Sequence, residues 1–249
     1  MTRYSLRVQP GYRRFKPFFE NMPQWFDGKG TVLHAKRNVV KAVRLADGTP
    51  VVVKRYCVPH LVPRLCYTFG RRSKARRAYD FALRLHDLGV DTPAPVACLE
   101  ERTCGLFGLS YFVCRRDDRP SLNVLYTLEG SERETLIDAF ADFLVCLHGK
   151  GFLHGDPNLS NILYEQRPDG TVRFSVIDIN RSRFCRQPSR KTCLRNLVRV
   201  THNRELMGAI VGSYARRRGW DEQESVQWVA LRLTHFEQRK RAKHALRKR

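Results

Sequence analysis

The spacing of apolar and polar residues divides the chain into a strand-rich first half and a helix-rich second half. Short apolar or alternating runs predict five strands, at Thr31–Ala35, Val39–Leu45, Pro50–Tyr56, Val96–Glu101 and Ser110–Cys114. Asp47-Gly48 is a hairpin signal between the second and third strands. Apolar residues at helical spacing predict a helix over Ser73–Leu88, ended by Gly89. Three successive strands joined by short turns are antiparallel, which excludes a parallel sheet with crossover helices.

The second half follows mainly the helical period. A long amphipathic helix is predicted over Glu132–Lys150, and two strand-like runs, Asn161–Tyr164 and Val172–Ile177, flank a turn. Helices are predicted from Arg181 through Leu246. We therefore predict an α+β fold with two lobes: residues 1–30 form an irregular N-terminal arm, 31–117 a small antiparallel five-stranded lobe with one helix, and 118–249 a mainly helical lobe with a basic C-terminal helix.

The net charge indicates the class of partner, and the cysteine spacing indicates the cellular compartment. The 249 residues carry a net charge of +22, and residues 181–249 hold 19 Lys and Arg against 5 Asp and Glu, so anionic partners are expected. The eight cysteines include no C-x-x-C pair, and we expect reduced, mostly buried thiols in a cytosolic protein. No secretory signal and no run long enough to span a bilayer are seen.

One stretch, residues 153–163, carries a pattern typical of phosphoryl transfer. His154-Gly155-Asp156 is followed by Asn161, and Asp178 ends an apolar strand seventeen residues further on. Such transfer needs a carboxylate beside the incoming hydroxyl, together with an Asn and an Asp that hold Mg²⁺ on the phosphates. The sequence therefore predicts Asp156 as the catalytic carboxylate, and Asn161 and Asp178 as metal ligands. His154 is expected to pack and to hydrogen-bond the loop backbone.

A lysine on the third strand completes this pattern. Lys54 follows three valines after a hairpin, the position at which a kinase places an ammonium group on the nucleotide phosphates. A carboxylate on the next helix should hold it, and Asp80 is the candidate, so Lys54 and Asp80 are the predicted ATP-binding residues. A simple surface ion-pair ladder with Arg76 and Arg84 is the competing interpretation of Asp80.

With these residues, the sequence resembles those of the lipopolysaccharide core kinases, the Kdo/heptose kinase family of Gram-negative bacteria, which have the protein-kinase-like fold. The resemblance covers roughly residues 30–215 and rests on five blocks: Val51–Lys54, Ser73–Ala75, Gly89–Pro95, His154–Asn161 and Ile177–Arg181. It implies ATP- and Mg²⁺-dependent phosphorylation of a Kdo or heptose hydroxyl on the inner core attached to lipid A. It also implies a cytoplasmic enzyme, peripheral on the inner face of the inner membrane.

Four departures from kinase patterns bear on the nucleotide and the acceptor. The turn after the first predicted strand lacks G-x-G-x-x-G and offers only Lys36 and Arg37 to phosphates. Asp-Ile-Asn stands in place of Asp-Phe-Gly, and Asn158 stands where protein Ser/Thr kinases usually carry a lysine. No long segment and no Ala-Pro-Glu follow Asp178, so the docking platform for a peptide is missing.

Other interpretations remain open at the level of sequence. The same fold also serves aminoglycoside-like acceptors or, in RIO-like kinases, proteins. A basic nucleic-acid-binding protein would explain the charge, but no nucleic-acid-binding motif accompanies it, and we expect no nucleic-acid partner. The basic tail Arg239–Arg249 follows a helix with apolar residues, which favours contact with an anionic membrane surface.

Overall fold

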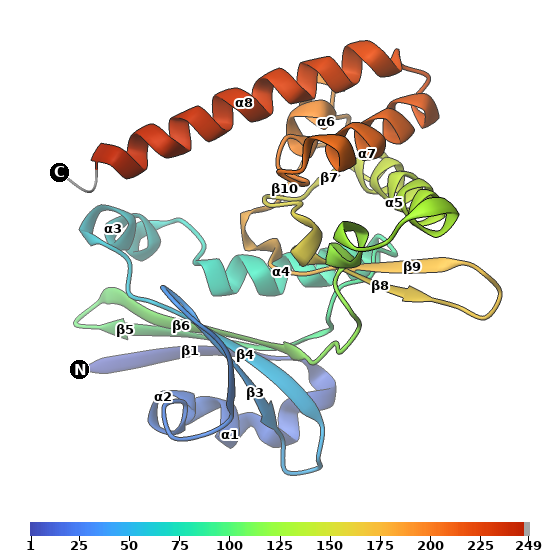
Figure 1. The fold of residues 1–249 in the computed structure, drawn as a ribbon. Coiled ribbons are helices and arrows are strands. Elements are labelled where there is room, and N and C mark those ends of the chain that lie inside the picture. Colours follow the sequence, from blue (N-terminus) through green and yellow to red (C-terminus); the bar gives the residue numbers. More distant parts are fainter. Residues whose placement is uncertain (247–249) are drawn as a thin grey trace. The chain divides into compact units, whose positions relative to one another are not determined.

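The computed structural model describes residues 1–246, and the chain forms two compact units, Met1–Asp118 and Arg119–Arg249 (Figure 1). The first unit is built on one antiparallel sheet of six strands in the order β1-β5-β6-β4-β3-β2. These are β1 (Thr2–Val8), β2 (Thr31–Ala35), β3 (Val39–Arg44), β4 (Pro50–Tyr56), β5 (Pro95–Thr103) and β6 (Leu106–Arg115). The α+β class and the mainly helical second half are confirmed.

The prediction of an irregular arm over residues 1–30, and of a sheet with only five strands, is wrong. β1 pairs with β5 from Thr2 opposite Thr103 to Val8 opposite Ala97. The apolar residues Tyr4, Leu6 and Val8 alternate with polar ones, which is a strand pattern that the prediction missed. Most β1 side chains are exposed, so burial contributes little to the position of the strand. Backbone hydrogen bonds to a neighbouring strand hold it at the sheet edge instead.

The rest of the N-terminal segment covers one face of this sheet. The 3-10 helix η1 (Pro10–Phe15) and the short helices α1 (Lys16–Glu20) and α2 (Met22–Trp25) bring Phe19, Met22 and Phe26 onto Val51 and Val53. These side chains are buried together. The segment therefore belongs to the core of the first unit (Figure 1).

Two further helices belong to the first unit, where one had been predicted. α4 (Lys74–Asp87) lies on the other face of the sheet and buries Ala75, Tyr79 and Leu85 (Figure 1). Ser73 caps its first turn, because the Ser73 hydroxyl accepts a hydrogen bond from the amide of Arg76 at 3.0 Å. The second is α3 (Leu61–Phe69), which contacts β6.

The second unit is mainly helical. Its elements are η2 (Leu122–Tyr126), α5 (Gly130–Gly149), β7 (Phe152–Leu153), η3 (Leu159–Asn161), β8 (Ile162–Gln166), β9 (Val172–Val176), η4 (Ile179–Arg181), β10 (Arg183–Phe184), α6 (Arg190–Leu197), α7 (Arg204–Arg217) and α8 (Glu222–Leu246). α7 contacts both α5 and α8, and its buried residues include Ile210 and Tyr214. In α8, Val229 and Leu233 are buried whereas Leu231 is exposed. Residues 247–249 of the basic tail lie outside the described residues.

The cysteines depart from their predicted burial. All eight are free thiols, but only Cys98 and Cys193 are buried, while Cys66, Cys104 and Cys146 are exposed. Cys146 follows an apolar run, yet its side chain is on the outward side of α5. Among residues 1–246, no helix is both long and apolar enough to cross a bilayer.

Candidate functional site

The 153–161 loop begins where two short strands meet. β7 pairs with β10, so that Leu153 lies opposite Arg183, and the chain leaves this pair at His154. On its other side the loop leads through η3 into β8, which pairs with β9 from Ile162 opposite Val176. Because β9 runs directly into Asp178, this pairing brings the segment of Asp178 beside the segment of Asn161.

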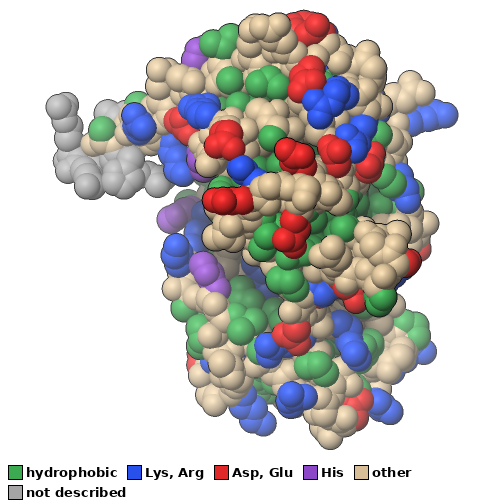
Figure 2. Space-filling model, turned by 45° about the vertical axis from the view of Figure 1, so that its right-hand side comes forward, with side chains coloured by type: hydrophobic (Ala, Val, Ile, Leu, Met, Phe, Trp, Pro, Cys, Tyr) green, Lys and Arg blue, Asp and Glu red, His purple; other side chains and the backbone are tan. Residues whose placement is uncertain are grey.

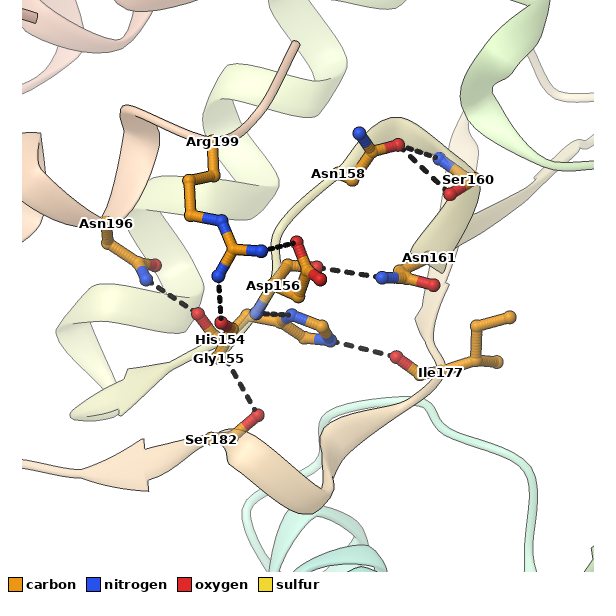
Figure 3. Close-up of polar contacts among 10 residues, drawn as sticks. All are labelled: His154, Gly155, Asp156, Asn158, Ser160, Asn161, Ile177, Ser182, Asn196 and Arg199. Carbon is orange, nitrogen blue, oxygen red and sulfur yellow. Dashed lines mark hydrogen bonds and ion pairs between the residues drawn. The ribbon is translucent and has the colours of Figure 1, made fainter. Parts of the chain in front are cut away.

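His154 is a buried support of this loop. One ring nitrogen, Nδ1, accepts a hydrogen bond from the Asp156 amide at 3.0 Å, and the other, Nε2, lies 2.9 Å from the carbonyl oxygen of Ile177 (Figure 3). Nδ1 must therefore be unprotonated, and the proton is on Nε2. Burial lowers the pKa of His154, which keeps the ring neutral. The prediction that His154 packs and bonds the loop backbone is confirmed.

Gly155 is required by a close approach of two backbone segments. A Cβ atom at this position would lie 2.3 Å from the carbonyl carbon of Arg181. The Gly155 amide donates to the Ser182 hydroxyl at 3.1 Å (Figure 3). The missing side chain thus allows the loop to lie directly against the segment that follows Asp178.

Asp156, the predicted catalytic carboxylate, is paired with an arginine that the sequence did not reveal. Arg199 places Nη2 3.1 Å from Asp156 Oδ1, and its Nη1 donates to the Gly155 carbonyl at 3.2 Å (Figure 3). Its guanidinium lies 5.3 Å from the ring centroid of Phe236. Arg199 lies 43 residues after Asp156, just beyond α6, and its only sequence signal is a basic residue within an apolar run.

Asn161 has a fixed amide orientation. Its Nδ2 donates to the backbone carbonyl of Asp156 at 2.9 Å (Figure 3). Its own backbone carbonyl accepts from the Ile177 amide at 2.9 Å. The side-chain nitrogen is thereby used within the loop, so the acceptor oxygen Oδ1 is the atom left to bind a ligand. Asn158, by contrast, bonds the amide and hydroxyl of Ser160 and starts η3.

Asp178 has an unusual backbone conformation. Its φ and ψ are 56° and 43°, the left-handed region that residues with a Cβ seldom occupy. Its Oδ1 accepts a hydrogen bond from Nδ2 of the buried Asn180 at 2.5 Å, while the residue itself is exposed. Such strained backbone is concentrated at functional sites, where it sets the direction of a side chain.

The oxygen atoms of Asn161 and Asp178 fit a hard divalent cation. Mg²⁺ prefers oxygen ligands and is commonly bound by one or two protein groups together with substrate phosphates. In residues 1–246 no group of three His, Cys, Asp or Glu side chains suits a metal ion. If Asn161 and Asp178 hold such an ion, most of its ligands would have to come from phosphate or water, because these residues supply only one amide oxygen and one carboxylate.

A second, buried set of polar residues supports the loop from the helices. Asn196 on α6 donates from Nδ2 to the His154 carbonyl at 2.7 Å and accepts at Oδ1 from His148 Nε2 at 3.1 Å. His148 in turn lies 2.8 Å from the Tyr214 hydroxyl. Burial lowers the pKa of His148 to about 4. The sequence did not reveal this hydrogen-bonded set, because His148, Asn196 and Tyr214 come from three separate helices.

The remaining predicted residues, Lys54 and Asp80, lie in the first unit. Lys54 is half-buried on β4, opposite Val40 of β3 and Phe112 of β6, and its Nζ lies 5.4 Å from the ring centroid of Tyr56. The structure places Asp156, Asn161 and Asp178 in neighbouring segments of the second unit and Lys54 with Asp80 in the first.

Asp80 is surrounded by arginines. Its carboxylate lies 3.0 Å from both Arg72 and Arg76, and 3.8 Å from Arg7. The i−4 ion pair with Arg76 anticipated by the competing interpretation is therefore present. The role of Asp80 beside Lys54 stays a prediction.

Comparison with known proteins identifies a family. The model of the lipopolysaccharide kinase (Kdo/WaaP) family matches residues 60–231. A 3-deoxy-D-manno-octulosonic acid kinase of Pasteurella multocida (strain Pm70) is 30% identical over 118 residues, which are 46% of this chain and 48% of that protein. The match thus spans about half the length of this curated relative.

A solved structure shares the fold. The structure described as WaaP in complex with acyl carrier protein matches with a TM-score of 0.62 at 18% identity, covering 93% of this chain and 98% of that chain. The two chains share a kinase-like fold along most of their length.

Proposed function

Because the chain belongs to the lipopolysaccharide kinase (Kdo/WaaP) family, we propose that it is an ATP- and Mg²⁺-dependent kinase that phosphorylates a Kdo or heptose hydroxyl of the lipopolysaccharide inner core. The observation that carries this proposal is the hydrogen bond from Asn161 to the Asp156 backbone, together with the bond from Ile177 to Asn161. These two bonds join the segments of all three predicted residues of the second unit.

In this proposal Asp156 receives the proton of the sugar hydroxyl or orients that hydroxyl for attack on the γ-phosphate. The Asp156 amide is bonded to His154 and its carbonyl to Asn161, so its backbone is fixed on both sides. The ion pair with Arg199 restrains one carboxylate oxygen. Arg199 is thus a positioning residue for Asp156.

The other four residues have roles toward the nucleotide. Asn161 Oδ1 and the Asp178 carboxylate would hold Mg²⁺, which neutralises charge on the nucleotide phosphates when bound. Lys54 would contact those phosphates, and Asp80 is the candidate carboxylate for holding Lys54. The left-handed conformation of Asp178 and its bond from Asn180 preset the direction of its carboxylate.

The acceptor is proposed to be a sugar and not a peptide. Asn158, at the position of the usual protein-kinase lysine, is used to bond Ser160. Between η4, which ends at Arg181, and α6, which begins at Arg190, only the two-residue β10 intervenes, so a long peptide-docking segment is missing there. The match to a Kdo kinase favours Kdo as the sugar. An acceptor screen that includes aminoglycosides and protein substrates tests this choice.

The same proposal includes peripheral association with an anionic membrane on the cytoplasmic side. Its support is the net charge of +22 and a proposed acceptor that is anchored in lipid. Association of this kind requires no membrane-spanning helix.

The test is direct. Purified protein is incubated with Mg-ATP and Kdo-lipid A, and a mass increase of one phosphate is sought by mass spectrometry. The same assay with Asp156→Ala should give no detectable product. Folded protein without product for any sugar acceptor, or full activity in Asp156→Ala, contradicts the proposal.

A further inference from the structure

Helix α3 presents its apolar side chains to the outside. Leu61, Val62 and Phe69 are 67%, 72% and 81% exposed, and Leu65 and the preceding Val58 are exposed as well. The spacing of Leu61, Val62, Leu65 and Phe69 places these four side chains on one face of the helix. Since a surface helix ordinarily turns such a face toward the core, this orientation requires a separate explanation.

The opposite face of α3 holds the helix on β6 through polar and aromatic contacts. Arg64 Nε donates to the Phe107 carbonyl at 2.7 Å, and the Thr68 hydroxyl accepts from the Phe107 amide at 3.0 Å. The rings of Tyr67 and Phe107 are 5.4 Å apart between centroids. These contacts fix the rotation of α3 about its axis, and they therefore determine that its apolar face points outward.

The surroundings of α3 are strongly basic. Between Asp47 and Asp80 the sequence contains eight Lys and Arg and no Asp or Glu. Arg71 and Arg72 follow the helix directly and are exposed. By contrast, the face of the molecule in Figure 2 carries Asp and Glu side chains among the Lys and Arg.

An open hollow lies at the same end of α3. Besides Phe69, its lining includes Arg71, Arg72, Arg76 and Arg102, with Glu100 as the acid of the lining. Asp80 pairs with Arg72 and Arg76, so the charge of the arginines is offset in part. An exposed apolar helix face next to such a basic hollow is complementary to a surface that is apolar inside and anionic at its border.

We propose that the apolar face of α3 inserts into the interface of an anionic lipid bilayer, with Arg71 and Arg72 at the level of the phosphate headgroups. The inference rests on the proposed function in one respect: an enzyme that acts on a lipid-anchored acceptor must bind at the membrane surface. It assigns the membrane contact to α3 and not to α8, whose Val229 and Leu233 are already buried in the second unit.

The test measures binding of the full chain to vesicles in the absence of ATP. Vesicles of phosphatidylglycerol and phosphatidylethanolamine are sedimented with the parent protein and with the triple variant Leu61→Gln, Val62→Gln, Phe69→Gln. We expect at least a tenfold lower partition coefficient for the variant, because it loses the inserted apolar surface. The matched control is Leu231→Gln, which changes a 64% exposed leucine on α8 and should bind as the parent does.

Charge is tested separately. Arg71→Glu should lower binding to these vesicles roughly fivefold or more, and should leave the weak binding to neutral phosphatidylcholine vesicles unchanged. Thermal unfolding should be similar for all variants, since the altered side chains are exposed.

The inference is overturned if the parent protein does not bind anionic vesicles, if the triple variant binds as well as the parent, or if Leu231→Gln weakens binding equally. It is also overturned if light scattering shows that the apolar face of α3 mediates self-association in place of vesicle binding. Kinase activity on detergent-solubilised Kdo-lipid A should be retained by the triple variant. Vesicle binding without phosphorylation of any acceptor would refute the proposed kinase activity and leave this inference standing. Phosphorylation without vesicle binding would refute this inference, together with the proposed membrane association, and leave the kinase activity standing.

Discussion

Asp156 and Asp80 both form ion pairs with arginine, but the two carboxylates are positioned in different ways. The Asp156 backbone is bonded to His154 and Asn161, and its one arginine also bonds the neighbouring Gly155. Asp80 sits on a helix among three arginines, of which Arg72 is largely exposed. A carboxylate whose backbone is fixed on both sides by loop contacts has a defined direction, whereas the carboxylate of Asp80 is shared among three arginines and mainly compensates their charge.

This difference predicts where substitutions are most harmful, and the largest effect should come from Gly155→Ala. The added Cβ would overlap the Arg181 backbone, so the loop must move. We expect a loss of about 3 kcal/mol of unfolding free energy and a loss of kinase activity of at least about a hundredfold. Urea unfolding and initial-rate assays measure the two effects.

The matched control for this change is Gly208→Ala on α7. Its nearest neighbour would be a Val226 methyl at 3.8 Å, so the added methyl group fits. Alanine in a helix should leave stability unchanged or raise it by up to about 1 kcal/mol. Equal effects of the two substitutions would show that the close approach at Gly155 is not a constraint.

The second prediction concerns the pH dependence of the support beneath the loop. Burial lowers the pKa of His148 to about 4, so below an unfolded-state pKa of about 6.5 the unfolded chain binds a proton that the folded chain does not. Stability from this group is therefore complete above pH 6.5 and is lost as the pH falls to about 4, by on the order of 3 kcal/mol. The buried His154 acts in the same direction.

The variant His148→Gln separates this contribution from that of other groups. Its unfolding free energy, measured by urea titration between pH 7 and pH 4, should fall less steeply than that of the parent protein. The exposed His34 provides the control, since His34→Gln should leave the slope unchanged. Parallel curves for the parent protein and His148→Gln would contradict the assignment.

The same contrast explains how much of the molecule could be predicted from its sequence. Asp156 and Asn161 are five residues apart in one loop, and Asp178 ends an adjoining strand, so their spacing is readable along the chain. Arg199 and Asn196 reach the loop from 40 or more residues away, and no local pattern encodes such an approach.

The fold, like the site, could be predicted only in part. α4 was predictable because its buried residues recur at helical spacing, as do those of α5. β1 was missed although Tyr4, Leu6 and Val8 alternate with polar residues; only its place beside β5, a strand far along the chain, has no local signal. The buried N-terminal residues Phe15, Phe19, Met22 and Phe26 also recur at helical spacing, but prolines start three short helical segments there in place of one long helix.

The third prediction tests Arg199 as a positioning residue. Arg199→Ala removes the contacts to the Asp156 carboxylate and the Gly155 carbonyl, and we expect kcat to fall about 10- to 100-fold with little change in KM for ATP. Arg199→Lys should be intermediate, because an ammonium group cannot reproduce the two-pronged geometry of the guanidinium.

Arg204→Ala is the control for Arg199. Arg204 also forms an exposed ion pair in the second unit, with Glu237 at 2.6 Å, but it has no contact with the loop. Its removal should leave kcat within about twofold of the parent value. A similar loss of kcat in both variants would indicate that general surface charge, and not the position of Asp156, is responsible.

The smallest effect on stability is expected at Asp80, and this prediction decides its role. Because the Arg72 and Arg7 partners are exposed, and an asparagine oxygen can still accept from the largely buried Arg76, Asp80→Asn should change the unfolding free energy by only about 1 kcal/mol. If Asp80 also holds Lys54 for the nucleotide, kcat/KM for ATP should still fall about tenfold or more. Asp87→Asn, at the end of the same helix, is the matched control. An Asp80→Asn variant with the parent's kcat/KM would restrict Asp80 to charge compensation, and the carboxylate partner of Lys54 would then have to come from another element.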